Sequence, residues 1–139
     1  MNSKLCEYKI GTKDEFCKTI SESDVYLFAG ITGDMNPLHI DSIKASQSFA
    51  KQRIVHGALL SGMVSTVIGM KLPGYGTVYI EQDSRFLKPV FIGDTVKAVV
   101  EIEDILNMEK GILKLNTYVL NQNGEMVLDG YAIVKAPEW

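Results

Sequence analysis

The chain has few of the residues that build disulfide frameworks or metal sites. It contains two cysteines and two histidines in 139 residues. Neither Cys6 nor Cys17 stands at a metal-ligand spacing from a histidine, and one histidine with one aspartate leaves a zinc ion short of ligands. We therefore predict reduced thiols in a cytoplasmic protein, and no metal site.

Runs of one charge sign are also missing. The net charge is −3 and the basic residues are scattered, which argues against a nucleic-acid partner. Charges at Lys4, Glu7 and Lys9 interrupt the apolar start that a signal peptide needs. Residues 54–70 carry no formal charge, but these 17 residues are at the lower limit for crossing a bilayer. Their histidine, glycine, serine and threonine content favours a buried helix over a membrane span.

Local patterns predict an α+β fold in one domain of residues 1–139. Ser21 and Asp24 resemble a capping box at a helix start, Gly33 suits the end of that helix, and Asp41 suits the start of the next. The last four strands are joined by tight turns, which predicts an antiparallel meander. The expected helices are 21–33, 41–49 and 56–71, and the expected strands are 5–10, 15–20, 77–90, 96–107, 111–122 and 125–136.

The expected helix at 57–70 has no charged side, so we predict that it is buried all round. Small residues fill one arc, with Ile68 as the large exception, and bulky residues fill the other. The small arc fits two uses: another backbone packs against it, or a thin ligand runs past it. The two uses are compatible with each other at a dimer interface. The bulky arc consists of Leu59, Leu60, Met63, Val64, Val67 and Met70.

The stretch "TGDMNPLH" holds an acid and an imidazole at Asp34 and His39. Fully extended, five residues span up to about 16 Å, too far for both groups to reach one substrate atom. Pro37 pushes Asn36 out of the helical region, so a bend there can bring the two together. Around one water they form an acid–base pair. The alternative is ordinary turn chemistry with a structural histidine.

"FAGITGDMNPLHID" (28–41) closely resembles the hydratase motif of the MaoC-like (R)-specific enoyl-CoA hydratases. The resemblance extends to "RIVHGALLSGMVS" (53–65) and to residues 72–96. It implies a hotdog fold, an antiparallel sheet wrapped around one long central helix. It also implies that Asp34 and His39 are the catalytic pair, that the Gly57 backbone N–H meets the thioester carbonyl as an oxyanion hole, and that Ser65 supports the pair. His56 also matches the family, and we interpret it as structural.

The resemblance implies reversible addition of water to trans-2-enoyl-CoA, giving (R)-3-hydroxyacyl-CoA in fatty-acid metabolism, with no cofactor. We expect a homodimer or higher homo-oligomer, with the acyl tunnel near the interface, and no membrane partner. Three alternatives stay open: a (3R)-hydroxyacyl-[acyl-carrier-protein] dehydratase, a thioesterase, and a non-catalytic hotdog module that only binds acyl-CoA. A carrier protein is acidic, so the first alternative would use basic residues, with candidates Lys51, Arg53, Arg85 and Lys88.

Overall fold

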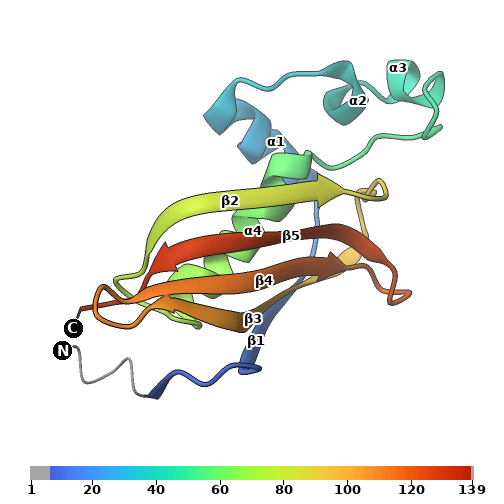
Figure 1. Ribbon diagram of the computed structural model, residues 1–139. Helices are drawn as coiled ribbons and strands as arrows, with labels where there is room; N and C mark the ends of the chain where they lie inside the picture. Colours follow the sequence, from blue (N-terminus) through green and yellow to red (C-terminus); the bar gives the residue numbers. More distant parts are fainter. Residues whose placement is uncertain (1–6, 139) are drawn as a thin grey trace.

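A long helix, α4 (Gly57–Met70), lies in the concave face of a five-stranded antiparallel sheet in the computed structural model, which describes residues 7–138 (Figure 1). Helix α4 is 14 residues long, and no helix of the described chain is long and apolar enough to cross a membrane. The arrangement confirms the α+β hotdog fold. The strands are β1 (Lys13–Thr19), β2 (Val78–Phe86), β3 (Thr95–Asn107), β4 (Ile112–Leu120) and β5 (Met126–Lys135).

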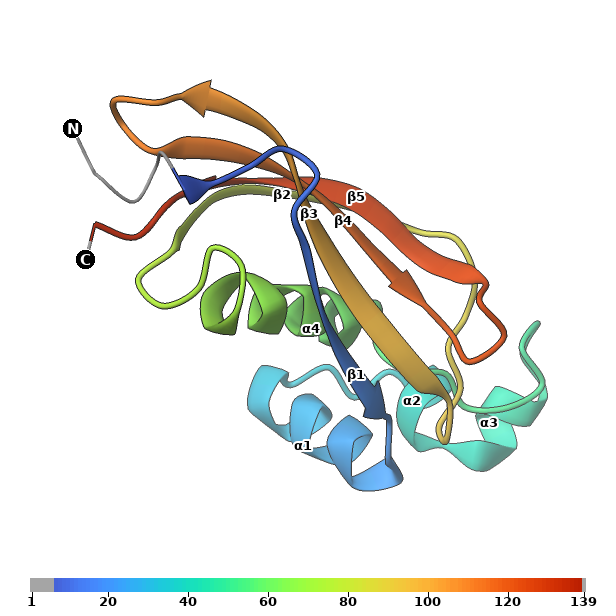
Figure 2. The ribbon, with the colours of Figure 1, turned by 90° about the horizontal axis from the view of Figure 1, so that it is seen from below.

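The strand order is β1-β3-β4-β5-β2, so the predicted four-strand meander is only partly correct. Strands β3, β4 and β5 do form a meander, but β2 pairs with β5 at the far edge and not with β3. The chain reaches β2 from the end of α4, which lies across the concave face of the sheet (Figure 2). Edge positions for β1 and β2 leave each strand paired on one side only.

The predicted strand at 5–10 is wrong for residues 7–10, which form no strand; residues 5 and 6 lie outside the described residues. Gly11 has a φ of 91°, which turns the chain before β1 begins. The second predicted strand, 15–20, corresponds to β1, which pairs with β3 from Lys13↔Glu101 to Thr19↔Thr95.

One side of α4 packs on the sheet and the other is open. Leu60, Val64 and Ile68, spaced four apart, are at most 3% exposed and belong to the single core cluster. Ile68 is therefore a core residue, and Met70, which we assigned to the bulky buried arc, is 58% exposed. The prediction that α4 is buried all round is wrong for this chain, because its small side carries exposed residues such as Gly62.

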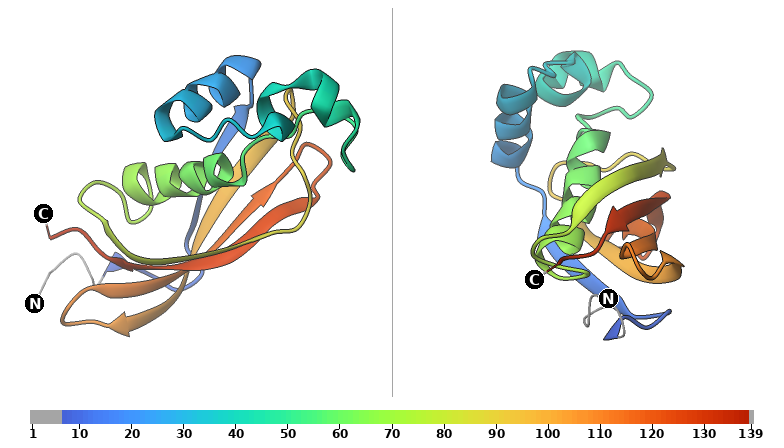
Figure 3. Two further views of the ribbon diagram at one scale, coloured as in Figure 1. Left: turned by 90° about the horizontal axis from the view of Figure 1, so that it is seen from above. Right: turned by 60° about the vertical axis from the view of Figure 1, so that its left-hand side comes forward.

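Three further helices lie on the same side of the sheet as α4, near its first turn (Figure 3). Helix α1 (Glu22–Thr32) has the predicted capping box of Ser21 and Asp24, and Gly33 ends it with a φ of 82°. A one-turn helix, α2 (Pro37–Ile40), follows where we expected only a bend. Helix α3 (Ser42–Ser46) begins at Asp41 as predicted, but it is shorter than the expected 41–49.

Candidate active site

The loop after α1 folds back on itself through short side-chain hydrogen bonds. The Thr32 hydroxyl accepts from the Asp34 N–H at 3.2 Å, and the Asp34 carboxylate accepts from the Asn36 N–H at 3.3 Å. Asn36 then caps α2, accepting from the Leu38 N–H at 3.1 Å. These turns reverse the chain within a few residues. As a result, ligand atoms of Asp34, His39 and His56 all lie within 4.8 Å of one another.

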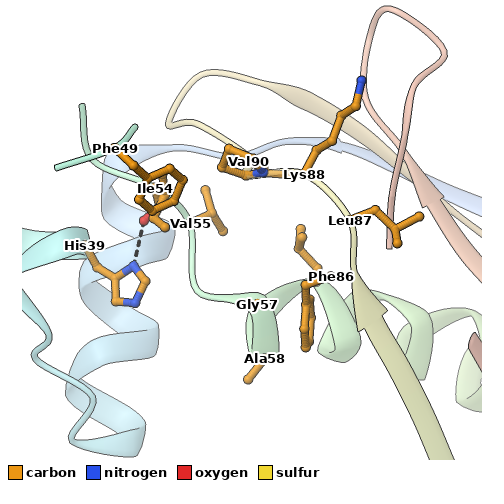
Figure 4. Close-up of a pocket in the computed structure, with 12 residues that line it drawn as sticks. His39, Phe49, Ile54, Val55, Gly57, Ala58, Phe86, Leu87, Lys88 and Val90 are labelled. Carbon is orange, nitrogen blue, oxygen red and sulfur yellow. Dashed lines mark hydrogen bonds between the residues drawn. The ribbon is translucent and has the colours of Figure 1, made fainter. Parts of the chain in front are cut away.

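His39 is held in one tautomer by a backbone carbonyl. Its side chain is buried, 8% exposed, and Nδ1 lies 2.7 Å from the Ile54 carbonyl oxygen (Figure 4). A carbonyl oxygen only accepts, so Nδ1 carries the proton and donates. In the neutral ring this leaves Nε2 with its lone pair, as a general base requires.

His56, which the sequence analysis interpreted as structural, also lies in this cluster, and its position beside Asp34 and His39 was not predicted. It is 1% exposed, and its Nε2 lies 3.0 Å from the backbone carbonyl oxygen of Asp34. Its ring stacks on His39 with centroids 3.8 Å apart, and Phe28 covers it at 4.8 Å. The available signal was a histidine directly before Gly57 in an otherwise apolar stretch.

The three clustered groups are a poor metal site. The His39 and His56 rings are 26° from parallel and stacked face to face. Imidazole lone pairs lie in the ring plane, so two stacked rings direct them side by side and not toward a common point. One nitrogen of each ring is already engaged by a carbonyl, at Ile54 and at Asp34. The arrangement suits proton transfer better than tetrahedral coordination.

Gly57 is the first residue of α4, so its N–H has no partner within the helix. His56 at the N-cap makes no side-chain cap hydrogen bond, which leaves this helix end open to another acceptor. The helix dipole at this end favours negative charge. The Phe86 ring lies against Gly57: a Cβ added there would be 2.8 Å from Phe86 Cε1.

His39 and Gly57 line one cavity of about 600 Å³ (Figure 4). Apart from His39 and Lys88, its lining is apolar and includes Ile54, Val55 and Phe86. An apolar cavity with a few polar groups at one end is the usual form of a small-molecule site. Here the polar groups are the His39 imidazole and the Gly57 N–H, which has no partner within α4, and the walls suit a hydrocarbon chain.

Ser65 lies eight residues further along α4. Burial raises the pKa of Tyr79 on β2, and a hydrogen bond with Ser65 opposes that rise. The hydrogen-bond partner of Ser65 is thus Tyr79. Among residues 7–138, Ser65 makes no hydrogen bond with Asp34 or His39.

Three of the four basic candidates are engaged in ion pairs. Arg53 pairs with Glu22 at 2.6 Å and also donates to the Tyr26 hydroxyl. Arg85 pairs with Asp83 and Asp129, and Lys88 pairs with Glu125. Of the four, Lys51 alone has no ion pair recorded in the described part of the chain.

This chain belongs to the MaoC like domain family, whose pattern matches residues 7–123. It is 40% identical over 131 residues to the (R)-specific enoyl-CoA hydratase of Rhodospirillum rubrum, covering 94% of this chain and 90% of that protein. Its structure is similar to the unliganded R-hydratase PhaJ1 of Pseudomonas aeruginosa, with a TM-score of 0.91 and 40% identity over 97% of this chain and 86% of that one. It is also similar to the (R)-hydratase of Aeromonas caviae involved in PHA biosynthesis, with a TM-score of 0.89 and 38% identity over 94% and 98% of the two chains.

Proposed function

We propose that this chain is an (R)-specific enoyl-CoA hydratase, a hydro-lyase that adds water reversibly to trans-2-enoyl-CoA. The observation that carries the proposal is the approach of Asp34 and His39 to within 4.8 Å, beside the apolar cavity that His39 shares with Gly57. The identity with named (R)-specific hydratases over most of the chain supports the same reaction. The stereochemistry and the thioester carrier rest on that likeness.

In the proposed reaction, Asp34 and His39 hold one water between the carboxylate and Nε2. One member of the pair takes a proton as the water oxygen bonds to C3 of the enoyl group, and the C2=C3 electrons move toward the thioester carbonyl. The Gly57 N–H donates to the oxygen that becomes negative. A proton delivered to C2 completes the (R)-3-hydroxyacyl thioester and regenerates the pair.

Coenzyme A is the proposed thioester carrier. The support for this carrier is the identity with named (R)-specific enoyl-CoA hydratases over most of the chain. The apolar walls of the cavity suit the acyl chain.

We also propose a homodimer or higher homo-oligomer, with the acyl tunnel near its interface. The edge strand β2 exposes Val78 (58%) and Ile80 (58%). Unpaired apolar edge strands are covered in most native proteins, and the open small side of α4 lies nearby. A second copy would cover both. An exposed free thiol at Cys17 supports a reducing, cytoplasmic location, and we treat residues 1–139 as one domain.

The direct test follows loss of the enoyl absorbance of crotonyl-CoA. Asp34→Asn and His39→Gln should each lower kcat by about 10³-fold or more, while circular dichroism stays unchanged. Near-normal turnover by either variant would refute its assigned role, and the (S) product on a chiral column would refute the stereochemistry. Faster turnover of the matching carrier-protein thioester would favour the dehydratase. Tight binding of crotonyl-CoA without turnover would indicate a binding module.

A further inference from the structure

His56 lies where the three parts of the proposed site meet. Its Nε2 contacts the backbone of Asp34, its ring faces His39, and the next residue in the chain is Gly57. The side chain is 1% exposed, whereas Asp34 itself lies in an exposed loop. Of the side-chain hydrogen bonds that hold Asp34, those to Thr32 and Asn36 are local and solvent-exposed. The bond from His56 therefore ties this loop to the buried start of α4.

Two carbonyl groups fix the two histidines in opposite tautomers. His39 donates from Nδ1 to Ile54, and His56 donates from Nε2 to Asp34. Each ring then keeps its lone pair on the other nitrogen. Because the rings are stacked 3.8 Å apart, a shift of the His56 ring would also shift the face against which His39 packs.

The remaining nitrogen of His56 is buried and unused. Its Nδ1 has no hydrogen-bond partner among residues 7–138. A second proton on this ring would therefore place a buried N–H where no described residue accepts it, which is unfavourable.

We propose that His56 is a positioning residue that fixes Asp34 relative to His39 through its Nε2–H and its stacked ring. This inference rests on the proposed hydratase function. Misplacing a reacting group by about 1 Å can lower a rate on the order of 10²-fold, whereas binding of the substrate's remaining atoms is unaffected. Loss of His56 should thus appear in kcat and much less in KM.

Two substitutions separate the hydrogen bond from the ring. His56→Phe keeps an aromatic ring and removes the donor, and kcat should fall about 10- to 100-fold with KM changed less than about threefold. His56→Gln places an amide N–H near the position of Nε2, so it should recover a substantial part of that loss. Val119→Ala on β4, in the core, is the control for lost stability. If both His56 variants keep wild-type kcat, or if Val119→Ala lowers kcat equally at equal unfolding free energy, the proposal is wrong.

The unmodified protein provides an independent test. Because the chain has two histidines, the long-range ¹⁵N–¹H spectrum of untagged protein contains two imidazole patterns. We expect one Nδ1–H tautomer, from His39, and one Nε2–H tautomer, from His56, in the spectrum of the neutral rings. The same tautomer in both rings would overturn the inference even if the variants fail to fold. A wild-type protein without hydratase activity but with opposite tautomers would refute the proposed function and leave the geometry of His56 standing.

Discussion

The substitution Gly57→Ala tests the proposed oxyanion site with one methyl group. The new Cβ would lie 2.8 Å from Phe86 Cε1 and 3.0 Å from Cδ1. Ordinary carbon–carbon contact begins near about 3.5 Å, so the overlap is roughly 0.7 Å. The ring is 55% exposed and can swing outward, which relieves the overlap at small energetic expense.

Stability and activity should therefore respond differently to this change. Alanine is more favourable than glycine in a helix by up to about 1 kcal/mol. This gain offsets the cost of displacing the Phe86 ring. The free energy of unfolding should therefore change by less than about 1 kcal/mol. The methyl and the displaced ring both crowd the cavity beside the Gly57 N–H. Alanine keeps the backbone N–H, so the variant acts by keeping the substrate oxygen away from it. A donor that the substrate cannot reach is equivalent to a lost one, which lowers kcat by about 10²- to 10³-fold, and we expect a fall in that range.

The assay is hydration of crotonyl-CoA, with unfolding in urea measured on the same preparations. Gly30→Ala in α1 is the matched control, because its added Cβ meets nothing within 4 Å. It should stabilise the protein by up to about 1 kcal/mol and leave kcat unchanged. If Gly57→Ala keeps kcat within a few-fold of wild type, the reasoning that a methyl group at position 57 blocks the approach to this N–H is wrong.

Three further predictions concern the helix cap, the serine and the edge strand. The pKa of Asp24 is lowered, chiefly by the backbone N–H of Ser21, so Asp24→Ala should reduce the free energy of unfolding by about 1 kcal/mol near pH 7. The difference in unfolding free energy between wild type and Asp24→Ala should narrow as the pH falls below about 3.9 and then through the lower pKa of Asp24 in the folded protein, because the carboxylate takes up its proton there. If urea titrations show the same difference at every pH, the carboxylate does not stabilise this helix end. Ser65→Ala should raise the pKa of Tyr79 in a phenolate absorbance titration, because it removes the hydrogen bond that lowers it. A fall in crotonyl-CoA turnover beside that shift would support the proposed role of Ser65 with the catalytic pair, and unchanged turnover would refute it. Ile80→Lys on β2 should convert the oligomer to monomer in light scattering, and an unchanged mass would exclude this edge from the interface.

Predictions about local structure were confirmed because their causes lie within a few residues. The capping box joins Ser21 to Asp24, three positions apart, and Gly33 ends α1 through its own backbone conformation. The apolar helix and the last four strands likewise follow from short-range periodicity. The pair of Asp34 and His39 was predicted from the Asn-Pro bend together with the family motif, and its close approach is consistent with that bend.

The sequence by itself determined the long central helix, helix α1 with its caps, most of the strands and the residues with the chemistry for proton transfer. Only the tertiary structure decided which edge strand β2 joins, that Ile68 and not Met70 enters the core, and that His56 reaches the backbone of Asp34. The physical reason is range: a cap or a hydrophobic period needs neighbours within about four positions. The His56–Asp34 bond joins groups 22 positions apart, and its geometry exists only after α1, the loop and α4 have packed against the sheet.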